Sequence, residues 1–380
     1  MTMPDIPGYI CPRDGRTSAA AELSRRCPDC GSPWDLAFTA AGVDRDELSG
    51  RPSSLWRYAE ALPLSAPVIS FGEGRTPLVR ITGRLSVKLD FLMPTLSFKD
   101  RGAVLLLEAA RRLEPDRVIA DSSGNAGTSV AAYAARAGLP CVIFVPAATS
   151  AKKVEQIRAH GAEVMIIEGD REATARAAQR AADEPGTFYA SHVYNPYFLH
   201  GTKTYAYELW EDLGGRLPEV IVVPVGNGTL VLGVALAVAE LVDHGLIAST
   251  PPIVAVQAEP VSPLARARAE GLTEVPIGYA TSAETITEGI AIAEPARSTQ
   301  ILAAIDSSGG DIVTVTDAEV RSAQRDLAGR GLYVEATAAA CWAAVRHAEA
   351  AVHDQLGWRL LRDRQTVVPL CGAGLKTGLL

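Results

Sequence analysis

Short apolar, β-branched runs alternate with longer amphipathic segments over most of the chain. The runs predict strands near residues 86–91, 117–121, 141–145, 163–167, 219–225, 252–257, 311–315 and 365–370. The segments between them repeat apolar residues at helical spacing and predict helices near 98–113, 128–137, 150–159, 171–182, 198–213, 229–243, 317–329 and 335–353. Alternation of this kind is typical of the α/β class, in which helices cover a mostly parallel sheet.

One apolar stretch, Val220 to Leu241, is long enough to raise the question of a membrane span. It is interrupted by Pro224, by Gly226 to Gly228 and by Glu240. Such interruptions fit a buried strand, a loop and a buried helix better than a single apolar helix. We therefore expect no membrane partner.

Charge and cysteine content narrow the possible partners and compartment. The 380 residues include 36 Lys and Arg against 44 Asp and Glu, a net charge of −8 with no long basic run. Nucleic acid and anionic membranes are therefore not expected as partners. Six cysteines in a chain of this length do not form the disulfide framework of a secreted domain, and no signal peptide precedes Tyr9. These features predict a cytoplasmic protein.

The first 50 residues differ from the rest, because they contain two cysteine-rich tight turns, 11–15 and 27–31. We expect a zinc-ribbon-like segment over 1–50, followed by a catalytic domain over 51–380. A structural zinc ion would have as ligands Cys11, Asp14, Cys27 and Cys30. Asp14 stands where a fourth thiolate would complete the usual Cys₄ set. The alternative is a metal-free remnant held by its own turns and by packing. Either way, the distance along the chain predicts that activity depends only weakly on this segment.

Four loops directly follow predicted strands. The first, Pro94 to Gly102, contains Lys99 in the first turn of a predicted helix. A permanent cation opposes the helix dipole at this position, so an amine that is readily neutralised, or held as an imine, fits better there. The other three loops are 121–128, 226–230 and 371–376. All four lie at the carboxyl ends of predicted strands, where open α/β sheets bind their ligands.

Taken in this order, the four loops resemble those of the pyridoxal-phosphate enzymes of fold type II, and most closely those of the threonine synthase group, over roughly residues 68–380. The resemblance implies the tryptophan synthase β-like α/β fold. A small mobile subdomain would span about 93–200, the rest of 51–380 would form a larger one, and the cofactor would lie in the cleft between them. It also implies pyridoxal 5′-phosphate as the cofactor and a small amino acid as the substrate. We expect a homodimer.

The same resemblance assigns roles to the residues that bind the cofactor. Lys99 would hold the cofactor as an imine and then act as the base at the substrate α-carbon, which requires a lowered lysine pKa. Cys371 would face the pyridine nitrogen, where a thiol leaves that nitrogen largely neutral; the alternative is a small buried apolar residue. The cofactor phosphate would be bound by Gly226, Asn227, Gly228 and Thr229, through backbone N–H groups at a helix start. A Gly-Asn-Gly run alone could also be an ordinary turn.

The remaining loop of the four, 121–128, is assigned by the resemblance to the substrate carboxylate, with Asn125 also contacting the cofactor's ring hydroxyl. Its residues are Ser122, Ser123, Gly124 and Asn125. The same loop could simply cap the helix that follows, and both roles are compatible.

The chain departs from threonine synthases where the substrate phosphate would bind. Phe198 stands at the position of a family arginine, and Leu230 stands where an asparagine is common. Leu96 also replaces a common glycine beside the lysine. Loss of the arginine removes charge-assisted hydrogen bonds to a phosphate. His192 and Tyr194 could then bind a different leaving group, although ordinary packing is an equal explanation for each.

We therefore interpret the sequence as that of a pyridoxal-phosphate-dependent lyase or synthase. It would catalyse elimination or replacement at the β- or γ-carbon of a small amino acid other than phosphohomoserine. Three alternatives remain open: an authentic threonine synthase, a serine or threonine dehydratase-like deaminase, and a non-catalytic homologue that binds the cofactor.

Overall fold

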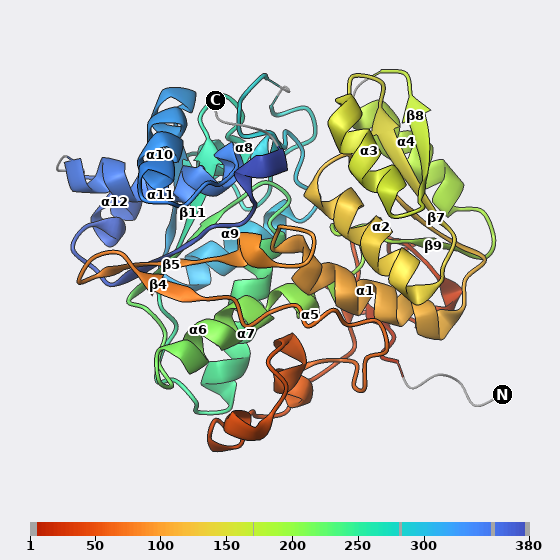
Figure 1. Ribbon diagram of the computed structural model, residues 1–380, viewed down its shortest axis with the longest axis horizontal. Coiled ribbons are helices and arrows are strands. Elements are labelled where there is room, and N and C mark those ends of the chain that lie inside the picture. Colours follow the sequence, from red (N-terminus) through yellow and green to blue (C-terminus); the bar gives the residue numbers. More distant parts are fainter. Residues whose placement is uncertain (1–5, 170, 281–282, 351–353, 377–380) are drawn as a thin grey trace. The chain divides into compact units, whose positions relative to one another are not determined.

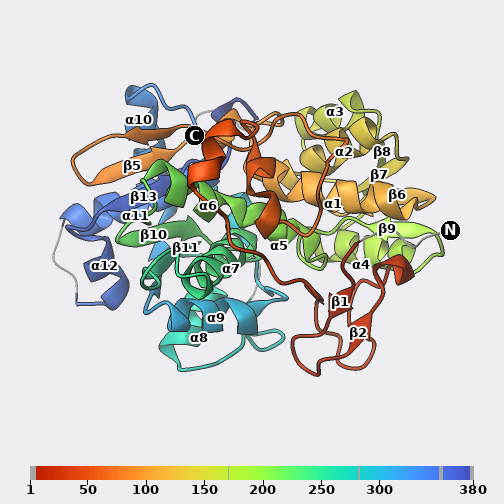
Figure 2. The ribbon, with the colours of Figure 1, turned by 90° about the horizontal axis from the view of Figure 1, so that it is seen from below.

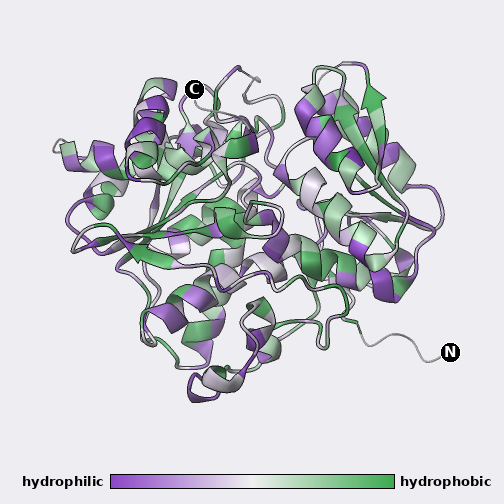
Figure 3. Cartoon of the chain, viewed as in Figure 1, coloured by the Kyte–Doolittle hydropathy of each residue, from purple (hydrophilic) through white to green (hydrophobic). Residues whose placement is uncertain are grey.

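The computed structural model describes residues 6–169, 171–280, 283–350 and 354–376. By their contacts these residues divide into two compact units. The first unit comprises Met1–Glu73 and Lys99–Thr202, and the second comprises Gly74–Phe98 and Lys203–Leu380. Each unit is built around its own main sheet (Figure 1), and apolar residues are frequent in both of these sheets (Figure 3).

The first unit contains a four-stranded parallel sheet in the order β8-β7-β6-β9. Its strands are β6 (Arg117–Ala120), β7 (Cys141–Pro146), β8 (Glu163–Ile167) and β9 (Thr187–Tyr189). Its helices are α1 (Lys99–Leu113), α2 (Asn125–Ala137), α3 (Ala151–Ala159), α4 (Arg171–Ala182) and α5 (Tyr197–Thr202). α2 and α3 lie on one face of the sheet and α4 on the other (Figure 2). Right-handed crossovers require this, because the strand order reverses direction between β8 and β9.

A small antiparallel sheet in the first unit is formed by the N-terminal segment, in the order β2-β1-β3. Its strands are β1 (Tyr9–Ile10), β2 (Thr17–Ser18) and β3 (Asp35–Leu36). Tyr9 and Trp34, which are 2% and 1% exposed, belong to the same apolar cluster as the buried face of α1. The N-terminal segment is therefore part of the core of the first unit.

The second unit contains a six-stranded sheet in the order β12-β11-β10-β13-β5-β4, parallel except for the edge strand β4. Its strands are β4 (Leu78–Arg80), β5 (Leu85–Lys88), β10 (Val220–Pro224), β11 (Ile253–Ala258), β12 (Asp311–Val315) and β13 (Thr366–Pro369). Its helices are α6 (Thr204–Asp212), α7 (Thr229–Asp243), α8 (Pro263–Ala269), α9 (Ser298–Ser307), α10 (Asp317–Gly329), α11 (Ala336–Ala350) and α12 (Leu356–Leu361). β10 and β11 are buried throughout, as is usual for parallel strands covered on both faces.

The α/β class, all eight predicted strands and all eight predicted helices are confirmed, with two informative differences. Residues 351–353 of the helix predicted over 335–353 lie outside the described residues. The helix predicted over 198–213 is broken at Lys203 into α5 and α6, and α2 begins at Asn125 rather than at 128. The structure adds the short elements β1 to β4, β9, α8 and α12, which offer few residues for a periodic pattern, and it adds α9, a helix of 10 residues that the sequence reasoning missed. The apolar stretch from Val220 forms β10 and α7, as predicted. Among the described residues, no helix is both long and apolar enough to cross a membrane.

A buried group of charges fixes β5 to α6 in the second unit. The Lys88 ammonium is fully buried and lies 2.9 Å from the Glu208 carboxylate and 2.7 Å from that of Asp212. It also donates to the Thr76 carbonyl at 2.6 Å. Glu208 accepts from the backbone N–H groups of Arg75 and Thr76, at 2.7 and 3.2 Å. Each buried charge therefore has several partners, which offsets its desolvation.

We expect Lys88→Met to lower the free energy of unfolding by roughly 3–5 kcal/mol, because it leaves the Glu208 carboxylate buried without its counter-charge. Denaturant unfolding followed by circular dichroism measures the change. The control is Arg346→Ala, which removes a 54% exposed side chain paired with Glu349; it should cost less than about 1 kcal/mol. Equal unfolding midpoints for the two variants would contradict the role given to Lys88.

Candidate active site

In the second unit, two predicted cofactor loops come to the same edge of the sheet. β10 and β5 both pair in parallel with β13, so the three carboxyl ends lie together. Gly226 to Thr229 follow β10, and Cys371 follows β13. The structure therefore brings the predicted phosphate loop and the predicted ring-facing cysteine onto adjacent strand ends, the usual ligand position in open α/β sheets.

The glycines of the phosphate loop leave room for backbone only. A Cβ atom on Gly228 would lie 2.3 Å from the Ile301 side chain, and one on Gly226 would lie 2.9 Å from the Ile290 Cα atom. Gly228 also has a left-handed φ of +77°. α7 begins at the next residue, Thr229, so its first N–H groups and the positive end of its dipole face this loop. This backbone cradle fits a phosphate group.

The chain just before Lys99 is hydrogen-bonded to the Cys371 loop within the second unit. The Phe98 N–H donates to the Cys371 carbonyl at 2.9 Å, and Ser97 pairs with Gly372 in an antiparallel bridge. Cys371 is 1% exposed. The Ser97 hydroxyl is buried and has no hydrogen-bond partner among the described residues. A buried hydroxyl without a partner is costly, so its position two residues before Lys99 fits a site that is completed by a polar ligand.

Leu96 adopts a backbone conformation that favours glycine. Its φ is +62°, in the left-handed region. The turn is held by two backbone hydrogen bonds, from the Leu96 N–H to the Met93 carbonyl and from the Ala373 N–H to the Leu96 carbonyl. A glycine would adopt this backbone conformation without the strain that a leucine side chain adds, and that strain was not visible in the sequence.

In the first unit, Lys99 is the first residue of α1, and α5 packs closely against that turn. A Cβ atom on Gly102 would lie 2.4 Å from the Phe198 ring, and one on Gly201 would lie 2.0 Å from the Arg101 carbonyl oxygen. This close approach places the Phe198 ring centroid 5.5 Å from the Lys99 ammonium nitrogen. The Phe198 ring is fully buried in the apolar cluster of the unit. Phe198 therefore lies beside the candidate lysine and is also a core residue.

Two further predicted loops come together at the ends of the parallel neighbours β6 and β9. Ser122 to Asn125 follow β6, and His192 follows β9. The first loop is tight, because a Cβ atom on Gly127 would lie 1.8 Å from the Ser122 carbonyl oxygen. The N-cap of α2 is Gly124, which has no side chain to occupy the first N–H groups of that helix. Those N–H groups suit a carboxylate.

His192 lies beside Phe198 and carries a perturbed imidazole. The two rings meet edge-on, with centroids 5.8 Å apart. Burial lowers the His192 pKa well below its usual value, and the positive charges of Lys99 and Arg171 lower it further. The imidazole is therefore neutral near pH 7 and can donate or accept a hydrogen bond without adding charge.

Tyr194 has contacts that tie it to its own unit. Its ring stacks on Tyr189 with centroids 6.2 Å apart, and the Arg26 guanidinium lies 4.7 Å from its centroid. The Tyr189 hydroxyl donates to Asp121 at 2.8 Å; burial raises the pKa of that carboxyl, although the tyrosine opposes the shift. These contacts fix Tyr194 within the first unit and fit a packing role, while a substrate-binding role stays a prediction.

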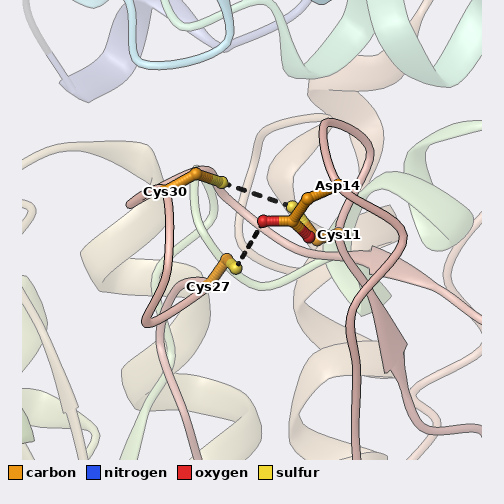
Figure 4. Close-up of side chains that lie close together, drawn as sticks. All are labelled: Cys11, Asp14, Cys27 and Cys30. Atoms are coloured by element: carbon orange, nitrogen blue, oxygen red, sulfur yellow. Dashed lines mark hydrogen bonds between the residues drawn. The ribbon is translucent and has the colours of Figure 1, made fainter.

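The four N-terminal candidate ligands also come together, as Figure 4 shows. Their ligand atoms all lie within 4.8 Å of one another. The Cys11 and Cys30 sulfur atoms are 3.5 Å apart, and the Cys27 thiol donates to Asp14 at 3.3 Å. The backbone N–H of Arg16 donates to Asp14 and lowers the pKa of the carboxyl to about 2, so this group is an anion at neutral pH.

Two residues of the site escaped the sequence reasoning. Ser97 could have been noticed as a small polar residue two positions before the lysine, but its burial without a partner depends on the distant Cys371 loop. Gly102 could have been noticed as a helix-interior glycine, which costs about 1 kcal/mol and so calls for a packing reason. Its partner Phe198 is far away in sequence.

The chain belongs to the pyridoxal-phosphate dependent enzyme family, whose profile matches residues 69–372. The fold is that of the fold type II members, including maize serine racemase (TM-score 0.65, 23% identity, 79% of this chain and 88% of that one). A threonine deaminase from T.th. has a TM-score of 0.64 at 27% identity, covering 79% and 92% of the two chains.

Among proteins of known activity, this chain is similar to threonine synthases. The one from Methanosarcina acetivorans is 32% identical over 382 residues, covering 95% of this chain and 93% of that one. The one from Methanocaldococcus jannaschii is 31% identical over 383 residues, covering 96% and 92%. The predicted resemblance is thereby confirmed at the level of the family.

The contact between Gly102 and Phe198 should appear as energetic coupling. We expect Gly102→Ala to lower the free energy of unfolding by about 1–3 kcal/mol, because the added methyl overlaps the ring. In a Phe198→Leu background the same change should cost less, with a coupling energy of about 0.5–3 kcal/mol. Gly329→Ala in α10, where a Cβ atom meets nothing within 4 Å, is the control. Additive costs in denaturant unfolding would show that the two residues do not share this space.

Proposed function

We propose that this protein is a pyridoxal-phosphate-dependent lyase or synthase that acts at the β- or γ-carbon of a small amino acid. The observation that carries the proposal is the sheet edge of the second unit. There, a glycine cradle at the start of α7 and the buried Cys371 follow adjacent parallel strands, and the backbone leading to Lys99 is hydrogen-bonded to Cys371. Family membership supports the cofactor, and these residues fit it.

Each residue has a task that its surroundings support. The cofactor supplies an electron sink for the pair of electrons left at the substrate α-carbon. Lys99 binds it through its amine and transfers the α-proton. The N–H groups of Gly226 to Thr229 bind its phosphate. Asn125 would bind the ring hydroxyl without adding charge, and Cys371 would take the position at the ring nitrogen, where a thiol would leave that nitrogen largely unprotonated.

The substrate part of the proposal follows from uncharged side chains at three positions, two beside Lys99 in the first unit and one in the second unit. Phe198 is apolar, and the low pKa of His192 keeps its imidazole neutral, so neither provides a fixed positive charge for a phosphate. Leu230 in the first turn of α7 is buried and apolar as well. We propose that the leaving group is not a phosphate and that the neutral His192 imidazole binds it through a hydrogen bond.

Two other activities have support of their own. The threonine synthase relatives support phosphohomoserine as the substrate, with its phosphate bound by other residues. The likeness to a threonine deaminase, together with Cys371, supports a dehydratase-like deaminase. A non-catalytic role is disfavoured, because Lys99, Asn125 and the glycine cradle are all present.

The proposal also includes a homodimer in the cytoplasm. The net charge of −8 and the free cysteines support the compartment, because neither suits a secreted disulfide-bonded protein. Light scattering on the purified protein measures the assembly: a mass of two chains supports the dimer, and a mass of one chain contradicts it.

The first test concerns the cofactor. Purified protein should absorb visible light as a lysine-bound cofactor does, and borohydride should fix the cofactor on Lys99, as identified by mass spectrometry. Lys99→Ala should lower turnover by roughly 10²–10⁴-fold, because it removes the group that transfers the proton. Its circular dichroism should match that of the natural protein. The matched control is Lys152→Ala, an exposed lysine on α3. Activity in colourless, cofactor-free protein would refute the proposal.

The second test concerns the substrate. We expect phosphohomoserine to be converted poorly, and an unphosphorylated or differently activated amino acid to be preferred. Phe198→Arg combined with Leu230→Asn should raise the relative kcat/KM for phosphohomoserine by about tenfold or more, because a charge-assisted hydrogen bond contributes about 1.5–3 kcal/mol. Phe198→Leu combined with Leu230→Met alters the same positions without adding donors and should leave the preference unchanged. Rapid production of threonine by the natural sequence would instead establish the threonine synthase hypothesis.

A further inference from the structure

The two cysteine turns of the N-terminal segment, 11–15 and 27–31, have the same fold. In each, the N–H of the final glycine donates to the carbonyl of the first cysteine, at 3.0 Å in the first turn and 2.9 Å in the second. Both glycines have a left-handed φ, +74° and +71°. Asp14 therefore occupies the position in the first turn that Cys30 occupies in the second (Figure 4).

The donor atoms of these turns suit one tetrahedral ion. Zinc bonds of about 2.3 Å to sulfur and about 2.0–2.2 Å to oxygen place tetrahedral ligand atoms about 3.5–3.8 Å apart. Two of the contacts, 3.5 Å between the sulfur atoms of Cys11 and Cys30 and 3.3 Å between Cys27 and Asp14, are close to that spacing. Three thiols and one carboxylate are too sulfur-rich for calcium or magnesium, which take oxygen ligands.

Within two residues before each turn lies a side chain that contacts the segment 194–197. Before the first turn, the Tyr9 ring meets the Tyr197 ring edge-on at 6.4 Å, and the Pro7 carbonyl accepts from the Tyr197 hydroxyl at 2.6 Å. Before the second turn, the Arg26 guanidinium lies 4.7 Å from the Tyr194 ring centroid. The two turns thus hold this segment at both of its ends.

The segment 194–197 connects the two candidate substrate residues, His192 and Phe198. We propose that Cys11, Asp14, Cys27 and Cys30 bind one zinc ion, and that this ion positions His192 and Phe198 through Tyr9 and Arg26. The zinc site stands on the geometry of the turns alone, whereas its effect on the substrate rests on the proposed function. Weak dependence of activity on these turns was expected from their distance along the chain, and the contacts argue for the opposite.

The zinc site is tested by elemental analysis of the full-length protein purified under reducing conditions. We expect about one zinc per chain, as in structural tetrahedral sites. Asp14→Asn and Cys27→Ser should lose the metal. The matched control is Asp29→Asn. Asp29 lies in the second turn, and its exposed carboxylate pairs with Arg16, so the change leaves the four ligands intact and the variant should retain the metal.

Zinc-free natural protein, or a Cys11–Cys30 disulfide in the reduced preparation, would overturn the site. If the Cys27→Ser variant fails to fold, mercurial titration of the natural protein decides instead. It should release one zinc into a chromophoric chelator as the thiols react, and no release would overturn the site equally.

The positioning role is tested by hydrogen exchange before and after removal of the metal. Peptides covering 187–199 should exchange faster in the metal-free protein and in Asp14→Asn, whereas peptides covering β7 should not change. In the loaded enzyme, Asp14→Asn should raise KM more than it lowers kcat, because the substrate residues move while Lys99 does not.

Unchanged exchange over 187–199 would overturn the positioning role, even with zinc bound. Failure of the proposed function would be recognised separately, because a protein without pyridoxal phosphate would still yield both the zinc content and the exchange rates.

Discussion

The parallel alignment of strands is the constraint on which the rest of this structure depends. Because β5, β10 and β13 run in the same direction, the loops that leave them emerge at one edge of the second sheet. The pairing of β6 with β9 does the same for the loops at Asn125 and His192 in the first unit. Within each unit, loops far apart in sequence thus become neighbours because their strands are paired. The buried strands stabilise the fold, so the loops are available for binding and catalysis.

Close backbone approach is the second requirement of the site, and glycine meets it. Gly102 and Gly201 allow α5 to lie against the first turn of α1, and Gly127 allows the Ser122 loop to fold back on α2. A glycine in a helix costs about 1 kcal/mol of intrinsic stability relative to alanine. Here that loss is offset by packing, since the same approach buries the Phe198 ring completely. The geometry around Lys99 therefore depends on positions without a side chain, such as Gly102 and Gly201, as well as on the packed Phe198 ring.

Sequence reasoning predicted the elements that have a local pattern of apolar residues, and it missed elements and conformations that depend on contacts with distant parts of the chain. The long helices and buried strands have clear periodicity, and the ligand loops could be located because each follows such a strand. β9 has three residues, too few for a period, and pairs with the β6 strand far earlier in the chain. The partnerless hydroxyl of Ser97 and the left-handed φ of Leu96 were inaccessible for the same reason, since both depend on the Cys371 loop. The domain boundaries and the roles of individual residues stay predictions.

Under the proposed function, Phe198 would link substrate choice to stability in this protein. The side chain is fully buried against Gly102, so the position belongs to the core as well as to the surroundings of Lys99. An arginine at this position would bury a guanidinium, at a cost of several kcal/mol whenever no anion pairs with it. A substrate phosphate can provide that anion only while it is bound. Phenylalanine avoids this desolvation cost in the free protein. It also lacks the positive charge that would bind a phosphate. A change of substrate class at this position therefore requires a change in the core, and the apolar choice favours the stability of the empty enzyme.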